Sequence, residues 1–547
     1  MSNMQRGVAK RYVAVFTAGV LVLCSAGCGT AYAEPAYGTG SITISQTEGN
    51  DTAFAGYRLF SANVRDDATA PTGKVATNLQ WASPEVRTAV EAVAGTSFAS
   101  AQDAADWIER GVTGTTDQTR VEATSLANRI ASSVAGTTEA VRVDGGQASQ
   151  GLGEGYWLFV TAADTLDAQG EVGTAPIFAV VGGSPVTVTE KASVVAASKK
   201  VLNNEAGSTQ GLAADAATGR ALGYTVEGTV PDNIATFSAQ GAQFFYGFED
   251  VLSQGLDYRE STARVLVDGA DVTDSFAVSY DQEKRTLTAT CEHLEAVAHA
   301  GSTVSLTYDA APNAQAVRGG EGNPNTARIE YSSNPNTDQR GSVTPPVVRT
   351  YTFALSLLKV DRNTEKPLEG ARFTITAPGG GYVQADGSVA DTAYEFPTGE
   401  DGTISVAGLD VGTYTISESS SPARYQKTRD FTVDIRADYD AGGALTGLGA
   451  VVEGNADAVA GLPDGTTGDN VLSAQTGTES DTKSGVVRVT VGDVRDFSLP
   501  LTGSNGAVAA VGAGACAVAG GVALNIRRRK RELANERTHH AGRGSAQ

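Results

Sequence analysis

Two stretches of the sequence place a polar side chain on an otherwise apolar strand face. In VVRVTVGDVRDF, strand alternation puts Asp493 on the same side as three valines. In NTARIEYSSNP, it puts Asn325 on the same side as an alanine, an isoleucine and a tyrosine. A buried lysine amine is held neutral and a buried carboxylic acid keeps its proton. Such groups can join through an amide bond, because a folded core supplies the proximity that the reaction needs.

Strands must position these side chains, and the composition favours strands. Glycine is abundant, at 64 residues, and Val, Thr and Ser recur in alternating runs with turns between them. The class expected is mainly β, with immunoglobulin-like sandwiches in series. The strands expected lie at residues 40–47, 155–162, 176–190, 221–230, 263–273, 285–290, 302–310, 326–333, 350–361 and 485–497. Apolar residues at three-to-four spacing predict helices at 84–94, 97–110 and 117–134, so the N-terminal part is expected to be α+β.

The first 33 residues have the pattern of a secretory signal peptide. A basic start precedes an apolar run over residues 12–24, and Ala31-Tyr32-Ala33 supplies a small-x-small cleavage pattern. A lipoprotein anchor at Cys28 is the alternative, although Ser25 stands where such anchors usually have an aliphatic residue. Of the four cysteines, Cys291 alone would survive maturation, so the secreted chain needs another means of stabilisation than a disulfide within a domain.

The other end carries three features in a fixed order. Residues 499–503 read LPLTG, residues 507–526 are mostly Ala, Gly and Val, and Arg527–Arg531 is a run of five positive charges. The apolar stretch is long enough to span a bilayer, and the basic run would stop transfer on the cytoplasmic side. The set resembles the cell-wall sorting signal of Gram-positive surface proteins.

That resemblance implies processing by a sortase, which is a membrane-bound cysteine transpeptidase. The motif residues are Leu499, Pro500, Leu501, Thr502 and Gly503. The sortase would cut between Thr502 and Gly503, hold Thr502 as a thioester and pass it to an amine. The alternative is an ordinary single-span membrane protein in which LPLTG occurs by chance.

The region of residues 347–498 contains SLLKVDRNTEKPLEGARFTIT and GLDVGTYTISESSSPARY. Both resemble Cna B-type domains, in which an early-strand lysine bonds to an Asn or Asp of the last strand. The resemblance implies that Lys359 is the nucleophile, Glu418 the catalytic acid and Asp493 the acceptor. Ser421 departs from the family's Ala before Pro, and Arg424 stands where the family commonly has Gly. The alternative is a surface lysine and a loop glutamate without a bond.

The region of residues 191–346 shows a weaker parallel to the middle domain of backbone pilins. SKKVLNNEAG resembles its first strand, which implies Lys200 as the nucleophile, with Lys199 as the second choice. FYGFEDVLSQGL resembles its acidic strand and implies Asp250. Asn325 on the expected closing strand is the acceptor, with Asn334 as the fallback. Residues 333–346 are expected to be a linker, and an ordinary sandwich without a bond is the alternative.

The region of residues 34–190 contains one lysine, Lys74, and no acidic motif of this kind, so no cross-link is expected there. Just after it, VTVTEKASVV loosely resembles the backbone-pilin motif whose lysine joins one subunit to the next. Lys191 matches that lysine, although Thr189 and Glu190 replace its usual Tyr and Pro. Lys199 is the rival, and a solvated linker lysine is the alternative.

The favoured function is the repeating shaft subunit of a sortase-assembled pilus, with residues 499–547 as its removable tail. The partners implied are pilin-type and housekeeping sortases, identical subunits and peptidoglycan, together with minor pilins and host surface ligands. A minor or tip pilin, or a monomeric wall-anchored adhesin, is the second reading. A net charge of −21 argues against nucleic acid, and no hydrolase or metal motif is present, so neither an enzyme nor a cofactor is expected.

Overall fold

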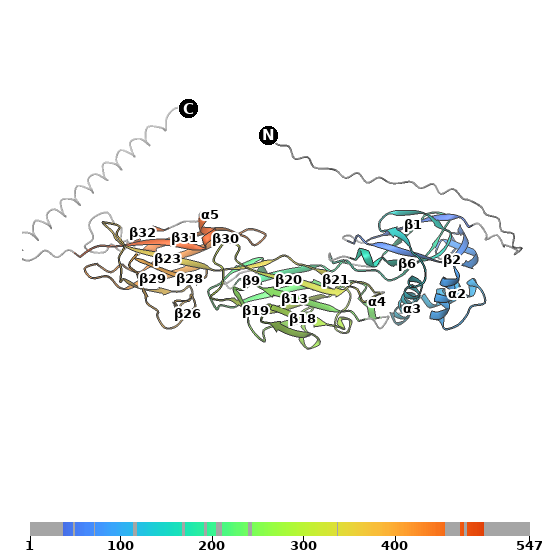
Figure 1. Ribbon diagram of the computed structural model, residues 1–547, viewed down its shortest axis with the longest axis horizontal. Helices are drawn as coiled ribbons and strands as arrows, with labels where there is room; N and C mark the ends of the chain where they lie inside the picture. Colours follow the sequence, from blue (N-terminus) through green and yellow to red (C-terminus); the bar gives the residue numbers. More distant parts are fainter. Residues whose placement is uncertain are drawn as a thin grey trace, which may run out of the picture.

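The computed structural model describes residues 37–46, 50–70, 72–112, 117–166, 170–190, 194–203, 210–238, 243–335, 337–454, 471–474 and 479–496. The expected signal peptide, Lys191 and the whole sorting signal lie outside the described residues. Within these ranges, six β-sheets form three successive groups along an elongated chain (Figure 1). The expectation of a mainly β chain with sandwich domains is confirmed.

The N-terminal group combines two sheets with three helices. Its elements are β1 (Thr39–Ser45), β2 (Ala53–Asp66), β3 (Lys74–Trp81), α1 (Pro84–Ala94), α2 (Ala101–Val112), α3 (Asp117–Ala135), β4 (Val141–Asp144), β5 (Ala148–Gly153), β6 (Gly155–Thr161), η1 (Ala163–Thr165), β7 (Ile177–Val181) and β8 (Val186–Thr189). The sheet orders are β3-β2-β6-β7, with β4 beside β2, and β5-β1-β8. One core cluster joins the helices to the first of these sheets.

Local sequence signals explain where α1 begins and ends. The Ser83 hydroxyl accepts a hydrogen bond from the Val86 backbone N–H (3.2 Å), and Pro84 occupies the first turn. Gly95 ends the helix with a φ of +67°, a left-handed conformation that glycine adopts without a steric cost. Between these ends, Val86, Ala89 and Val90 face the core, as the three-to-four spacing predicts.

The middle group is a two-sheet sandwich. Its elements are β9 (Ala197–Leu202), β10 (Gln210–Gly211), β11 (Ala213–Asp215), β12 (Leu222–Thr229), α4 (Ile234–Ser238), β13 (Tyr246–Leu252), β14 (Leu256–Tyr258), β15 (Arg264–Val267), β16 (Ala270–Asp271), η2 (Thr273–Ser275), β17 (Ala277–Asp281), β18 (Thr286–Cys291), η3 (Leu294–Ala296), β19 (Thr303–Pro312), β20 (Asn323–Ser332), β21 (Arg340–Val343) and β22 (Val348–Tyr351). One sheet runs β10-β9-β12-β19-β15-β16, with β14 on β19, and the other runs β11-β22-β20-β13-β18-β17, with β21 on β20.

The last strand of this sandwich is β22, which corrects two expectations. It pairs with β20, with Asn325 opposite Val348, and also with β11. The middle sheets therefore continue past the expected boundary at residue 346, and β20 is not the closing strand. The segment 333–346 is more than a linker, because its β21 also pairs with β20.

The C-terminal group is a second sandwich. Its elements are β23 (Phe353–Asp361), β24 (Arg372–Thr376), β25 (Tyr382–Val383), β26 (Val389–Ala390), β27 (Phe396–Pro397), β28 (Thr403–Leu409), β29 (Gly412–Ser420), β30 (Phe431–Tyr439), β31 (Leu445–Gly454), β32 (Val471–Ala474), α5 (Glu479–Ser484) and β33 (Val486–Asp493). Its sheets run β28-β23-β33-β32 and β26-β25-β24-β29-β30-β31, with β27 on β24. The first strand, β23, and the last, β33, are parallel neighbours.

A buried carboxyl lies where the middle and C-terminal groups meet. Asp215 of β11 is 1% exposed, and its Oδ2 accepts a hydrogen bond from Tyr439 Oη of β30 (2.7 Å). Burial, reinforced by the neighbouring Asp410, raises the pKa of Asp215 to about 8. Near neutral pH this contact between the two sandwiches therefore carries a proton.

Candidate cross-linking sites

The C-terminal sandwich brings together the three residues that its sequence predicts. Lys359 lies on β23, Asp493 on the adjacent β33 and Glu418 on β29 of the facing sheet, and all three side chains are fully buried. Lys359 Nζ donates hydrogen bonds to Asp493 Oδ1 and to Glu418 Oε2, the latter at 3.1 Å. Strand alternation accounts for the placement, because Tyr414, Ile416 and Glu418 share the core face of β29.

The two carboxyl groups of this site share a confined apolar space. Burial raises the pKa of Asp493 to about 7; the Lys359 ammonium opposes this shift and the nearby Glu418 adds to it. Glu418 Oε2 also accepts from the Thr428 backbone N–H (2.6 Å). By contrast, Glu418 Oε1 and Asp493 Oδ2 are buried and accept no hydrogen bond from the described residues. A proton on either carboxyl would let it donate to the other, so the site is suited to hold and move a proton.

The surroundings of Lys359 are apolar, as amine chemistry requires. Its Nζ lies 5.2 Å from the centroid of the Phe373 ring, and Phe373 is the register partner of Glu418 on β24. The amine is fully buried and already contacts a carboxyl oxygen of Asp493. The arrangement can therefore lose water to form an amide between Lys359 and Asp493, although the bond itself stays a prediction.

The departure from the Cna B-type pattern at Arg424 is visible in the backbone. Arg424 has a φ of +72°, in the left-handed region that glycine occupies most easily. Its carbonyl accepts from the Asp496 N–H (2.6 Å), just beyond the acceptor Asp493. Arg424 thus adopts the left-handed backbone conformation that glycine adopts most easily. Its hydrogen bond to Asp496 helps to hold the end of β33.

The middle sandwich forms a second site of the same composition. Lys199 of β9 donates hydrogen bonds from its Nζ to Asp250 Oδ2 of β13 and to Asn325 Oδ1 of β20. The distance from Nζ to Asn325 Oδ1 is 2.5 Å. Asp250 and Asn325 lie on one sheet and Lys199 on the other, so the site bridges the core between the two sheets. Burial lowers the pKa of Lys199 and raises that of Asp250, and both shifts favour the neutral pair. The sequence-based choices of Asp250 and Asn325 thus lie together, and their bond to a lysine stays a prediction.

The structure places Lys199, and not the first-choice nucleophile Lys200, beside Asp250 and Asn325. Along β9, Lys199 and Val201 are buried while Ser198, Lys200 and Leu202 are not, so Lys200 points away from the core. A shift of one residue moves a strand side chain to the opposite face. Lys199, the rival for the inter-subunit lysine, is buried, and the identity of that lysine stays a prediction. The fallback acceptor Asn334 lies beyond the end of β20, where its amide donates to Gln339 Oε1 (3.4 Å).

Sequence reasoning missed Tyr308 of β19, which completes the middle site. Its hydroxyl donates to Asp250 Oδ1 (2.8 Å) and accepts from Asn325 Nδ2 (2.5 Å). Burial, reinforced by Asp250, raises the pKa of this phenol well above its ordinary value. Alternation along STVSLTYDA puts Val304, Leu306 and Tyr308 on one face, a signal that could have identified the tyrosine.

The N-terminal lysine Lys74 lies in a polar surrounding. It begins β3, and its Nζ donates to Asp66 Oδ1 (2.7 Å) and to the carbonyls of Gly182 (2.7 Å) and Ser184 (2.8 Å). Asp66 is half exposed, which differs from the enclosed carboxyls of the other two sites. Lys74 thus pins the β7–β8 turn to the end of β2.

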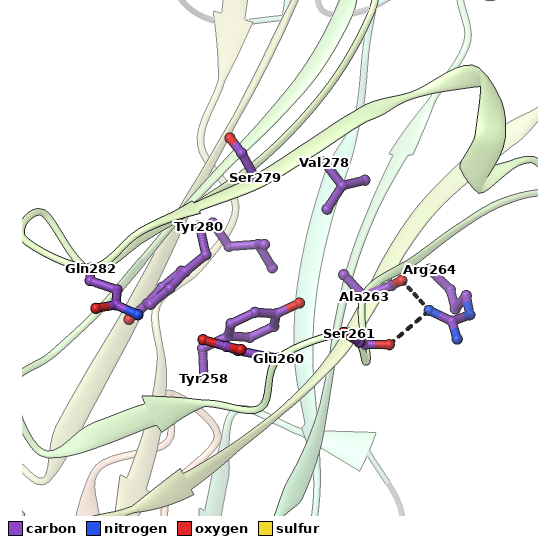
Figure 2. A pocket seen from close by; sticks show the side chains of 10 residues that line it. Tyr258, Glu260, Ser261, Ala263, Arg264, Val278, Ser279, Tyr280 and Gln282 are labelled. Atoms are coloured by element: carbon purple, nitrogen blue, oxygen red, sulfur yellow. Dashed lines mark hydrogen bonds between the residues drawn. The ribbon is translucent and has the colours of Figure 1, made fainter.

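The middle sandwich also has an open hollow of about 560 Å³ (Figure 2). Its lining includes Tyr258, Tyr280, Glu260 and Arg264, and the arginine Nη1 donates to the carbonyls of Ser261 (3.0 Å) and Ala263 (2.7 Å). The ring of Tyr258 contacts that of Tyr308, with 6.1 Å between centroids. The hollow therefore opens toward solvent one aromatic ring away from the middle site.

Among the described residues, no group of three His, Cys, Asp or Glu side chains is placed to hold a metal ion. None of the helices in the described ranges is both long and apolar enough to cross a membrane. The expected membrane segment 507–526 and the motif residues Leu499–Gly503 lie outside those ranges.

The C-terminal fold is that of a known domain family: residues 353–443 match the model of the SpaA prealbumin-like fold domain. Over a longer span, the T6 backbone pilin of Streptococcus pyogenes has a similar structure, at 16% identity and a TM-score of 0.52, with 85% of this chain and 100% of that chain covered. The major pilin SpaD of Corynebacterium diphtheriae aligns over 84% of this chain and 98% of its own, at 15% identity and a TM-score of 0.49. The similarity to the T6 pilin shows that the chain shares the fold of that backbone pilin. A comparison with curated proteins finds no match.

Proposed function

We propose that this chain is the shaft subunit of a covalently polymerised pilus on the surface of a Gram-positive bacterium. In this proposal a sortase cleaves after Thr502 and transfers the resulting thioester to Lys191 of the next subunit. Tension then enters each subunit at Lys191, crosses the middle and C-terminal sandwiches and leaves at Thr502. A housekeeping sortase would attach the finished fibre to peptidoglycan.

The observation that carries the proposal is the pair of buried lysine sites in the two sandwiches on that path. In Lys199–Asp250–Asn325 and in Lys359–Glu418–Asp493, the lysine amine contacts both a buried carboxyl and an acceptor. Hydrogen-bonded strands yield one bond at a time, and each bond contributes only about 1 kcal/mol. An amide bond does not open thermally, so such a cross-link suits a subunit held under tension.

The chemistry at the C-terminal site follows from its contacts. Glu418 takes a proton from Lys359 Nζ, and the neutral amine attacks the carboxyl carbon of Asp493. With Asp493 protonated, its hydroxyl takes a second proton from the nitrogen and leaves as water, and the proton first taken from Lys359 remains on Glu418. At the middle site, attack of Lys199 on Asn325 forms an amide and releases ammonia. Both closures occur once per molecule and do not make the chain an enzyme.

The test of the shaft role is polymer formation in the native host. Cell-wall extracts should contain a ladder of high-mass species that resist SDS, and Lys191→Ala should collapse it to the monomer. Lys200→Ala is the matched control, because Lys200 of β9 follows nine residues later in the sequence, points away from the core and should not affect polymer formation. If the ladder persists in Lys191→Ala, a lysine other than Lys191 joins the subunits. A wild-type chain without a ladder would favour a tip pilin or a monomeric wall-anchored adhesin.

A further inference from the structure

We infer that Tyr308 is a catalytic residue of the middle site, whose hydroxyl carries a proton from Asp250 to the amide nitrogen of Asn325 as that nitrogen leaves. The inference rests on the proposed Lys199–Asn325 bond and adds a fourth participant to it. It also makes the middle and C-terminal sites chemically different.

The geometry places two groups at opposite ends of the Asn325 amide. Lys199 Nζ contacts the oxygen Oδ1 at 2.5 Å, while Tyr308 Oη contacts the nitrogen Nδ2 at 2.5 Å. Tyr308 Oη also contacts Asp250 Oδ1 at 2.8 Å, and Asp250 Oδ2 contacts Lys199. The four side chains therefore form a closed ring that runs from the attacking amine through Asp250 and Tyr308 to the leaving nitrogen.

The chemistry requires a proton at that nitrogen. An amide nitrogen is a poor leaving group and has no free lone pair until the amine has added to the carbonyl carbon. In the tetrahedral intermediate Nδ2 gains a lone pair and can accept a proton from Tyr308 Oη. Asp250 Oδ1 replaces the tyrosine proton, and Asp250 Oδ2 takes one from the Lys199 nitrogen. The C–Nδ2 bond then breaks, so ammonia leaves, the new amide forms and Tyr308 ends unchanged.

The proton count closes for this route. Burial of Lys199 and Asp250 favours their neutral starting forms, so the lysine nitrogen starts with two protons and Asp250 with one. The product amide retains one of the lysine protons, and Asp250 takes the other. Asp250 gives its own proton through Tyr308 to the departing ammonia, so that Asp250 and Tyr308 both end unchanged and no reagent from outside the site is consumed.

The C-terminal site offers the contrast. Its acceptor is Asp493, whose oxygen leaves as water, and the nearby Glu418 contributes to the raised pKa of Asp493. Among the described residues, the hydrogen-bond partners of Lys359, Glu418 and Asp493 include the Thr428 backbone but no tyrosine hydroxyl. The tyrosine thus accompanies the site that must expel nitrogen and is absent where oxygen leaves.

A matched control stands beside Tyr308. Tyr224 of β12 is its register partner, is equally buried and stacks on its ring at 5.3 Å between centroids. The Tyr224 hydroxyl pairs instead with Thr350 Oγ1 (2.5 Å), away from the reacting groups. Tyr308→Phe and Tyr224→Phe therefore remove the same atom from neighbouring rings in one core.

The experiment follows closure in the full mature chain, residues 34–502, made by cell-free synthesis and quenched in acidic denaturant at successive times. Peptide mass spectrometry would count molecules in which Lys199 and Asn325 are joined. Tyr308→Phe should slow this closure by about 10²-fold, the usual size of a general acid–base contribution. Tyr224→Phe should close at nearly the rate of the unsubstituted chain. Equal rates for Tyr308→Phe and the unsubstituted chain would overturn the inference and leave the bond standing.

A second pair of variants separates proton transfer from packing. In Asn325→Asp the leaving atom is oxygen, so adding Tyr308→Phe should slow closure much less than it does with Asn325. The same slowing in both backgrounds would mean a structural role and would overturn the inference. If Tyr308→Phe fails to fold, a fluorinated tyrosine placed at 308 keeps the ring and hydroxyl but donates its proton more readily. Closure should then be faster, and an unchanged rate would count against the relay. An unsubstituted chain that never closes would instead overturn the bond proposal.

Discussion

Lys359 contacts Asp493 from the neighbouring parallel strand, although the residue directly across the register from Lys359 is Val491. The lysine side chain reaches two residues further along β33, to the last residue of that strand. A bond at this contact would join the first and last strands of the sandwich near the C-terminal ends of both strands. Residues 360–492 would then be enclosed in a covalent loop and relieved of tension.

The mass of the mature chain reports both closures. The chain of residues 34–502 should weigh about 35 Da less than its sequence, from one ammonia and one water. Lys199→Ala should leave a deficit of about 18 Da and Lys359→Ala one of about 17 Da. Lys200→Ala should keep the full deficit because its side chain lies outside the core. Loss of the ammonia deficit in Lys200→Ala instead would restore the original choice of nucleophile.

Glu418→Gln tests the proton shuttle of the C-terminal site. The amide keeps the shape of the side chain but cannot take the lysine proton, so the water deficit should disappear. Loss of the closed loop should lower the free energy of unfolding by roughly 4–5 kcal/mol, on the entropy model used for disulfides. Calorimetry of the variant and the unsubstituted chain measures the difference. Complete closure in Glu418→Gln would show that Glu418 is dispensable.

The C-terminal closure should depend on pH through Asp493, whose pKa in the unbonded site is raised to about 7. A neutral carboxyl accepts an amine far better than a carboxylate does, so closure should be fast below pH 7 and slow above it. Asp493→Asn removes this titration; its closure should release ammonia and should not share the loss of rate around pH 7. Time courses of peptide cross-linking at pH 5.5 to 8.5 compare the two, and identical profiles would contradict the role of Asp493.

The contact between the sandwiches should weaken as the pH rises. Asp215 has an ordinary pKa of 3.8 and a folded-state value of about 8, so between these values the folded chain binds the extra proton. Stability is therefore fully retained below about pH 4 and falls toward pH 8, by up to roughly 1.4 kcal/mol per pH unit. Asp215→Asn mimics the protonated form, so calorimetry should show a higher unfolding temperature than wild type at pH 8 and little difference at pH 4. The exposed Asp391→Asn is the control, and an equal gain there would refute the assignment.

Alternation along single strands predicted part of the two sites. Asp493 and Asn325 each share a face with apolar neighbours, and burial follows from that pattern. Lys359, Glu418 and Asp250 were chosen from the resemblance to Cna B-type and pilin domains instead. Lys199 could not be separated from Lys200, because Val201 and Leu202 place an apolar residue two positions after each lysine. The correct face depends on which side of β9 meets the opposite sheet, and that is a tertiary property.

The closing strand of the middle sandwich, β22, could not be predicted from the sequence either. VVRTY reads equally well as the start of the next domain, and its pairing with β20 and β11 depends on contacts distant in sequence. Tyr308, in contrast, had a readable pattern. It was missed because its hydroxyl partners lie on the other sheet, where strand alternation gives no information about distance.

β22 lies in the part of the chain between the two proposed bonds, and the length of that part limits how far a subunit of the proposed fibre could stretch. Because the middle bond would end at Asn325 on β20, residues 326–358 lie between the two covalent loops and belong to neither. Strong pulling could peel β21 and β22 from their sheets while both loops hold. Drawing out the whole stretch would also detach the rest of β20 and the start of β23, and the stretch would then span at most about 120 Å. Each subunit would then contain one short extensible segment between two cross-linked sandwiches. A fibre of such subunits could lengthen under a sudden load and return to its original length when the strands pair again.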